Sequence, residues 1–315
     1  NIATPASTNE SFSLGFNLSW ELDVWGRLTD QTRAAYLGAE AARLDLASTQ
    51  LSIAGATAQA FYALTESRLQ RQLSERDVET GEANLRIIER RYDRGISSSL
   101  DVRLARSSLA SSQATLIARQ QAEQEAARRL EVILGRYPAA AITASEALPQ
   151  PAIFQAGQTG VGTPSDILLG RPDVIAAERR LKAAGLDAAA ARKALLPSIS
   201  LSGAAQQFAG GLDDIAFDWS DSQRSLTASL FQPLFQGGRL RAQARAARND
   251  MEAVAFNYAS TMLTAYEEVE NALAAERFLT AQYEARKIAF EEAEASEDLT
   301  ERQYLSGTTN IFNLI

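Results

Sequence analysis

The sequence repeats one pattern at a constant offset of 212 positions (238 − 26). The tripeptide Gly26–Leu28 recurs as Gly238–Leu240, and a segment that ends in Tyr92 recurs with Tyr304 at its end. The distance from glycine to tyrosine is 66 positions in both copies (92 − 26 and 304 − 238). Loops drift in length whereas a helix under register constraint does not, so this shared spacing indicates one continuous helix in each copy. The chain is therefore a tandem duplication built around two long helices.

The first long segment, residues 27–92, has no proline and carries apolar or small residues at helical spacing. At 1.5 Å per residue such a helix measures roughly 100 Å, too long for a compact domain of this size. A turn is expected at 93–99, because Gly95 suits the left-handed conformation that ends helices. Ser97, Ser98 or Ser99 can then cap a second helix over 100–134. The sequence thus predicts two antiparallel helices joined by a tight turn.

The remaining elements follow from composition and from the offset. The first repeat covers 1–135 and opens with a strand at 12–22. A linker rich in Pro, Gly, Ala and Thr follows at 136–164. The second repeat covers 165–315 and contains a helix at 172–194, strands at 198–206 and 225–234, a long helix at 238–304 and a truncated turn. The offset places counterparts of one strand and one helix outside the chain. We therefore expect the middle of a longer protein that holds four strands and two helical hairpins.

The three strand segments alternate apolar and polar residues over the length at which a tilted strand crosses a bilayer, ~9 to 11 residues. Alternation alone favours a half-buried strand of a soluble sheet, so the context of the strands has to decide between the two. No segment reaches the ~18 to 20 uninterrupted apolar residues of a membrane-spanning helix.

Composition excludes many kinds of site. The chain has no Cys and no His, which removes disulfides, thiol nucleophiles, zinc clusters and triads with a His base. A net charge of −8 speaks against binding a nucleic-acid backbone. Four acidic residues lie in one loop (Asp213, Asp214, Asp218 and Asp221), but their spacing does not match an EF-hand calcium loop. A hydrolase that uses two of these carboxylates would need a concave site, and nothing in the sequence indicates an element that encloses one. The sequence predicts no enzyme, no cofactor and no metal.

Three ordered motifs resemble the outer-membrane efflux protein family, the TolC-like channels. They are Ser19–Arg27, Pro164–Val174 and Ala191–Leu201, and the resemblance covers essentially the whole chain. Within the family the chain is most similar to the NodT/OprM-type outer-membrane factors of resistance-nodulation-division multidrug efflux systems. The resemblance implies a mainly α fold with a β-barrel contribution, in which strands and very long antiparallel helices from three protomers form a trimeric α-barrel and an outer-membrane β-barrel.

The resemblance also implies a function and partners. It indicates a passive, homotrimeric channel in the outer membrane of a Gram-negative bacterium, extending into the periplasm and in contact with outer-membrane lipid but not with nucleic acid. Substrates would arrive from a resistance-nodulation-division inner-membrane transporter through a periplasmic adaptor (membrane fusion) protein. The channel would be gated at the periplasmic tips of its helices.

The family implies roles for residues at those tips. The expected adaptor-binding turn residues are Tyr92, Gly95, Ser98, Leu100 and Asp101 in the first repeat and Tyr304, Gly307 and Asn310 in the second. Phe312 is the hypothesised gate, because a ring of three phenylalanines would narrow the tube by dewetting. The alternative is structural: the two glycines only turn the chain, while Leu100 and Phe312 pack the hairpins.

Two further alternatives stay open on sequence alone. Trp20 and Trp25 suit an aromatic belt at the membrane interface, but they would equally suit a packed core. The whole chain could also be a soluble coiled-coil scaffold or adaptor with a small sheet. That alternative leaves three strands of bilayer-crossing length at helix ends unexplained.

Overall fold

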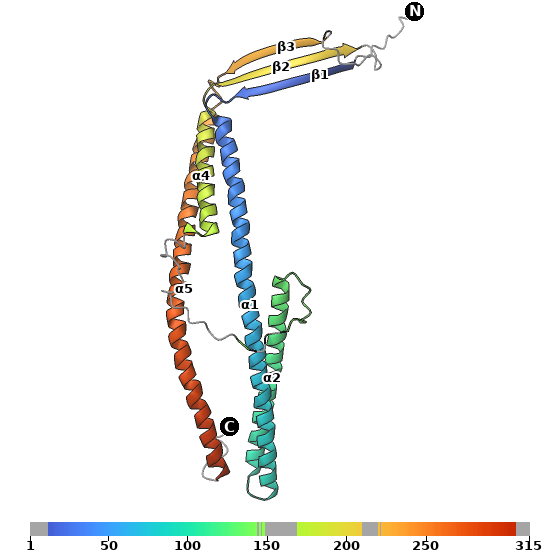
Figure 1. Ribbon diagram of the computed structural model, residues 1–315, viewed down its shortest axis with the longest axis vertical. Coiled ribbons are helices and arrows are strands. Elements are labelled where there is room, and N and C mark those ends of the chain that lie inside the picture. The colour runs from blue at the N-terminus through green and yellow to red at the C-terminus, as the bar shows by residue number, and fades with distance from the viewer. Residues whose placement is uncertain are drawn as a thin grey trace, which may run out of the picture. The chain divides into compact units, whose positions relative to one another are not determined.

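The structure is a computed structural model, and it describes residues 12–143, 145, 147–148, 169–209, 220 and 222–306. The elements are β1 (Phe12–Leu22), α1 (Arg27–Asp93), α2 (Ser99–Ile133), α4 (Pro172–Lys193), β2 (Ser198–Ala209), β3 (Gln223–Phe231) and α5 (Arg239–Leu305) (Figure 1). Both long helices have 67 residues, and both their starts (239 − 27) and their ends (305 − 93) lie 212 positions apart. The duplication expected from the sequence is therefore present in the helices.

The chain forms two compact units that do not coincide with the two repeats. One comprises residues 1–45 and 162–275, and the other comprises residues 46–161 and 276–315. The first contains the sheet, α4 and the opening parts of α1 and α5, while the second contains α2 and the rest of both long helices. Repeats and units differ because each long helix contributes residues to both units.

The sheet has the order β1-β2-β3, and both pairs are antiparallel. β2 extends to Ala209, beyond the expected end at 206, because it pairs with the whole of β1 as far as Phe12. β3 ends at Phe231 instead of the expected 234. The reason is Pro233, which has no N–H to donate to a strand ladder. The first repeat thus supplies one strand of the sheet and the second repeat supplies two.

The helices bury mostly small side chains. Near the middle of α1, Leu64 packs with Ala60 of the same helix and with Ala127 and Leu130 of α2. In the unit that holds the sheet, Val174 of α4 packs against α5. Many large apolar side chains along the helices remain exposed, which is unusual for a protein that acts alone. None of the described helices combines the length and the apolarity that crossing a membrane requires.

The residues after α2 fold back onto the hairpin. Glu131, only 2% exposed, accepts hydrogen bonds from the backbone N–H groups of Ala140 (2.8 Å), Ala141 (2.7 Å) and Ile142 (3.2 Å). Burial acts to raise the pKa of Glu131, but these N–H groups outweigh it and hold the pKa below its usual range. Ala140 and Ile142 also contact the Leu64 cluster. The start of the expected linker is therefore docked on the hairpin.

Two acidic residues shape the junction between β1 and α1. Asp23 accepts hydrogen bonds from the backbone N–H groups of Leu28 (2.9 Å) and Thr29 (2.7 Å) and from the Thr29 hydroxyl (2.7 Å). The bond from the hydroxyl, together with those from the backbone, outweighs burial and lowers the pKa of Asp23 to about 2. Glu21 accepts two bonds from the guanidinium of Arg27, at 2.7 and 2.8 Å. The first turn of α1 is thereby capped and tied to the strand before it.

The same junction is tied to the end of α4. Lys193 Nζ lies 2.5 Å from Asp30 Oδ2 and donates to the carbonyl of Gly26 at 3.2 Å. Gly26 has a backbone φ of +71°, which residues with a side chain rarely adopt, so glycine is needed where the chain turns from strand to helix. Trp25 is 46% exposed, and its Nε1–H donates to the carbonyl of Pro197 at 2.7 Å. Trp25 is thus held at the surface and is no core tryptophan.

Candidate functional site

The turn between α1 and α2 is built by backbone hydrogen bonds around Gly95. The Gly95 N–H donates to the carbonyl of Tyr92 at 2.8 Å, and the Ile96 N–H donates to the carbonyl of Arg91, also at 2.8 Å. This pair of bonds is the Schellman arrangement, which requires a left-handed residue at the helix end. Gly95 supplies it with φ +72°. The expected role of Gly95 in turning the chain is confirmed.

Ser98 begins the second helix of this turn. Its hydroxyl accepts the backbone N–H of Asp101 at 3.2 Å, and the Asp101 carboxylate accepts the backbone N–H of Ser98 at 2.7 Å. These reciprocal bonds form a capping box, which satisfies donors at the helix start that have no partner within the helix. The backbone and hydroxyl of Ser98 lower the pKa of Asp101. Ser98 and Asp101 therefore define the shape of the turn.

The apolar residues of the turn divide into a packed set and an exposed set. Val102 and Ala105 of α2 pack against Ile88 of α1. Leu100 is 62% exposed, so it does not pack the hairpin, contrary to the structural alternative drawn from the sequence. Ile96 is exposed to the same extent, and Tyr92 is 47% exposed. Sequence reasoning missed Ile96 because it lies inside the turn, yet an apolar residue directly after a helix-ending glycine is a signal that could have found it.

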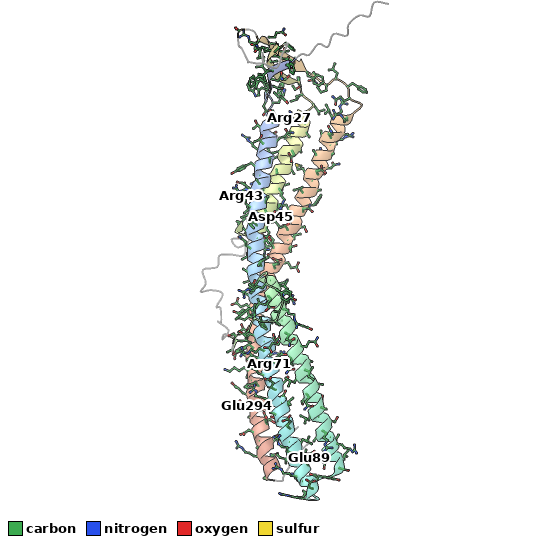
Figure 2. All side chains as sticks on the ribbon, turned by 90° about the vertical axis from the view of Figure 1, so that its right-hand side faces the viewer. Arg27, Arg43, Asp45, Arg71, Glu89 and Glu294 are labelled. Carbon is green, nitrogen blue, oxygen red and sulfur yellow. The ribbon has the colours of Figure 1, made fainter. Side chains whose placement is uncertain are left out.

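Ion pairs hold the two helices of this hairpin together. Glu89 of α1 lies close to the turn (Figure 2), and its carboxylate is 2.7 Å from the guanidinium of Arg106 in α2. Farther back along α1, Arg71 lies 2.5 Å from Glu123 of α2 and 2.5 Å from Glu75 of its own helix. The two glutamates raise the pKa of Arg71 against the opposing effect of burial. The turn is thus presented by a hairpin that is braced along its length.

The second expected tip is only partly described. Tyr304 lies in the last turn of α5, which ends at Leu305. Gly307, Asn310 and Phe312 lie outside the described residues, so the gate hypothesis has no structural counterpart. The acidic loop residues Asp213, Asp214, Asp218 and Asp221 lie outside them as well. No group of acidic residues that could hold a metal ion occurs within the described ranges.

From Asn17 to Leu22 of β1 and the residues paired with them, the sheet has one apolar and one polar face. Directly opposed residues of antiparallel strands point to the same face, so the pairing register sorts the side chains into rows. Three neighbouring rows on one face are Leu18-Gly203-Leu226, Trp20-Leu201-Ala228 and Leu22-Ile199-Leu230. The rows that alternate with these lie on the opposite face and are Asn17-Ala204-Ser225, Ser19-Ser202-Thr227 and Glu21-Ser200-Ser229. Trp20, Leu18 and Leu226 are 57%, 66% and 75% exposed, so the apolar face has no cover from the described residues.

Comparison with known proteins identifies the family. The family described as outer membrane efflux protein matches residues 3–136 and 163–314, which include parts of both repeats. The chain belongs to the outer membrane efflux protein family. Members are transport components located in the outer membrane of Gram-negative bacteria, and this is the location of the chain.

Two curated relatives illustrate the family. The chain is 29% identical over 308 residues to the pyoverdine export outer membrane protein OpmQ of Pseudomonas putida, covering 98% of this chain and 64% of the relative. It is 31% identical over 307 residues to the toluene efflux pump outer membrane protein TtgF, also of Pseudomonas putida, covering 97% of this chain and 62% of that relative. The chain thus spans less than two thirds of the length of these family members.

Solved structures show the family fold. The outer membrane protein VceC of Vibrio cholerae matches with a TM-score of 0.85 at 23% identity, covering 100% of this chain and 74% of that chain. The outer-membrane channel OprN matches with a TM-score of 0.84 at 29% identity, covering 99% of this chain and 70% of that chain. The TolC-like, mainly α fold expected from the sequence is confirmed, and the described residues are mostly helical with a small sheet.

Proposed function

We propose that the complete protein is a passive outer-membrane conduit, built by three copies, through which substrates leave the cell. The carrying observation is the register of the sheet, which places apolar rows on one face and polar rows on the other. An apolar, exposed face suits contact with lipid, and the polar face suits a water-filled passage. Arg224 lies on the apolar face, but it stands one residue from the start of β3, where a long side chain can reach the interface.

The edges of the sheet support assembly from several copies. Within the described residues, β1 and β3 each pair with β2 alone. Lipid offers no hydrogen-bond partner to the free edge of a strand, and each unsatisfied group costs several kcal/mol there. Strands from other copies, or from other parts of the complete protein, must therefore close the sheet. A homotrimer meets this requirement and also gives the exposed apolar residues of the helices a partner.

The turn between α1 and α2 is the proposed contact with a periplasmic adaptor protein, which passes on substrates from an inner-membrane transporter of the resistance-nodulation-division type. Tyr92, Ile96 and Leu100 present exposed apolar groups there. Gly95, together with the capping box, fixes the turn that carries them. Exposed apolar residues on a rigid support are what a binding surface needs. By the repeat, Tyr304, Gly307 and Asn310 belong to a second such contact, and Phe312 remains the proposed gate.

Two neighbouring substitutions test the conduit. Leu226→Arg places a charge on the proposed lipid face, which costs about 2 to 4 kcal/mol in the middle of a bilayer. Thr227→Arg places the same charge on the proposed polar face, where water can solvate it. In the complete protein, we expect the first variant to lose most membrane insertion and conductance in planar bilayers. The second should insert normally and shift ion selectivity towards anions.

Equal behaviour of the two variants would contradict the assignment of the faces. A complete protein that remains in the aqueous phase without detergent and shows no conductance would overturn the conduit and favour a soluble scaffold.

A further inference from the structure

The two junctions where a strand leads into a long helix differ sharply in charge. Residues 21–36 of the first junction contain three acidic residues and two arginines (Glu21, Asp23, Asp30, Arg27 and Arg33), a net charge of −1 (2 − 3). The equivalent residues 233–248 contain no acidic residue and four arginines (Arg239, Arg241, Arg245 and Arg248), a net charge of +4 (4 − 0). Two copies of one structural unit therefore differ by five charges over 16 positions (36 − 21 + 1).

The difference arises because uncharged residues replace all three acidic residues, while two arginines are kept and two more, Arg241 and Arg248, replace Thr29 and Tyr36. At the offset of 212, Glu21 corresponds to Pro233, Asp23 to Phe235 and Asp30 to Ala242. Arg27, which pairs with Glu21, corresponds to Arg239, whose side-chain hydrogen bonds within the described residues go to the neutral side chains of Gln236 and Gln243. Arg241 and Arg245 are exposed and form no ion pair with any described residue. Arg248 pairs with Glu252 at 3.3 Å, but Arg239, Arg241 and Arg245 have no acidic partner among the described residues, so the second junction holds positive charge that the described part of the chain does not neutralise.

Helix stability does not account for these arginines. The N-terminus of a helix carries a partial positive charge, so the cations in the first turn of α5, Arg239 and Arg241, are unfavourable there. The first turn of α5 has no acidic residue to offset them, and the first acidic residue of the helix is Asp250. Charge held in an unfavourable position indicates a partner that is negative and lies outside the described chain.

Exposed apolar side chains lie next to this charge. Leu234 and Phe235 are 91% and 89% exposed, and Phe231 at the end of β3 is 61% exposed. Leu234 and Phe235, with Arg239 and Arg241, line a hollow of about 380 Å³ at this junction. In Figure 1, β3 leads into α5 at this point. Cations beside exposed apolar groups at the end of a membrane-crossing strand match the chemistry of a lipid interface, apolar on one side and anionic on the other.

We propose that residues 231–248 dock on anionic phospholipid, with the arginines on the lipid phosphates and the apolar side chains among the first carbons of the acyl chains. This inference rests on the proposed function, which places β3 in the membrane. The first junction, with its paired arginine and its net negative charge, does not share this role. The two repeats therefore contact the membrane surface differently.

Lipid binding by the complete protein tests the proposal. The purified protein in neutral detergent is titrated with phosphatidylglycerol or with phosphatidylcholine, and bound lipids are counted by native mass spectrometry. The variant Arg241→Gln/Arg245→Gln should lose roughly tenfold to thirtyfold in affinity for phosphatidylglycerol, since each arginine near an anionic surface contributes about 1 kcal/mol. Arg241→Lys/Arg245→Lys should keep the affinity. The control Arg286→Gln/Lys287→Gln removes two exposed charges from the same helix and should have no effect.

Three outcomes overturn the proposal. In the first, the glutamine variant binds phosphatidylglycerol as tightly as the wild type does. In the second, the control variant loses as much affinity as the glutamine variant. In the third, the glutamine variant no longer forms trimers while its protomers keep the lipid preference, which would assign the arginines to contacts between copies. Conductance is measured on the same preparations. A wild type that conducts but binds both lipids equally overturns this inference alone, whereas a wild type that does not conduct overturns the proposed function itself.

Discussion

Replacing Lys193 by methionine should loosen the junction between sheet and helices more than any comparable loss of surface charge. Lys193 closes the end of α4 against the first turn of α1 through Asp30 and the carbonyl of Gly26. Its side chain is 31% exposed and that of Asp30 is 10% exposed. Methionine is unbranched and reaches as far as the Cε atom of lysine, so the substitution removes the charge and the hydrogen bonds while preserving most of the packing of the apolar stem.

The magnitude follows from distance and burial. Two unit charges 2.5 Å apart attract by roughly 7 kcal/mol at an effective dielectric constant of about 20. Withdrawal of both groups from water offsets much of that attraction. Breaking a fully buried pair costs about 3 to 5 kcal/mol, because the remaining charge loses its partner. Since Lys193 is about one-third exposed, we expect a smaller cost of about 2 to 4 kcal/mol.

Local opening is the appropriate measurement, because a chain of two compact units need not unfold in one step. Hydrogen exchange of the backbone amides in the first turns of α1 and at the start of β2 reports the free energy of opening at the junction. Lys182→Met is the matched control. Lys182 lies on the same helix and pairs with Glu178 at 2.6 Å, but the two side chains are 51% and 39% exposed. Its loss should cost about 0.5 kcal/mol or less.

The double variant Asp30→Asn/Lys193→Met completes the test. Because it leaves no buried charge without a partner, it should recover most of the lost protection. Lys193→Met with unchanged protection, or with a loss no greater than that of Lys182→Met, would refute the reasoning. So would a double variant that is less protected than Lys193→Met alone.

Two further predictions concern the α1–α2 hairpin. The pKa of Glu131 is lower in the folded chain than in the unfolded one, so its stabilising effect is complete above the unfolded pKa of about 4.3 and is lost as pH falls through the folded pKa. Hydrogen exchange of the amides of residues 140–142 should therefore rise as pH falls through the folded pKa. Glu131→Gln should abolish this pH dependence. Leu100→Ala should weaken adaptor binding about tenfold in a pull-down titration while changing the hairpin's stability by less than about 0.5 kcal/mol, because Leu100 is exposed. Val102→Ala, a buried control, should instead cost about 2 kcal/mol of local stability, and the reverse pattern would place Leu100 in the core.

Local signals in the sequence predicted the helices well. The limits of α1 and α5 follow from the repeated glycine signals that flank them, and the turn follows from Gly95 and Ser98, whose effects act within a few residues. The end of β3 was predicted less well. Its alternating pattern continues past Phe231, but the missing N–H of Pro233 ends the ladder first.

Long-range contacts could not be predicted from local patterns. Nothing in the sequence near Asp30 indicates Lys193 as its partner, because the two lie 163 positions apart. The exposure of Leu100 was equally hidden, since spacing does not tell which of Leu100 and Val102 faces α1. The docking of residues 140–142 was missed because their composition is that of a linker, and the interaction depends on one buried glutamate.

The pairing of β1 with β2 has a consequence for the order of folding. The closest paired residues of these strands, Leu22 and Ile199, are 177 positions apart (199 − 22), whereas the α1–α2 hairpin joins neighbours in sequence. Contacts that close long loops form late, because the loss of chain entropy precedes any gain in contacts. We therefore expect the hairpin to form first and β1 to wait unpaired until the second repeat has been synthesised. During that interval the apolar residues and the unpaired edges of β1 are open to misassociation, so the first strand of the chain is the segment most in need of protection until β2 is available.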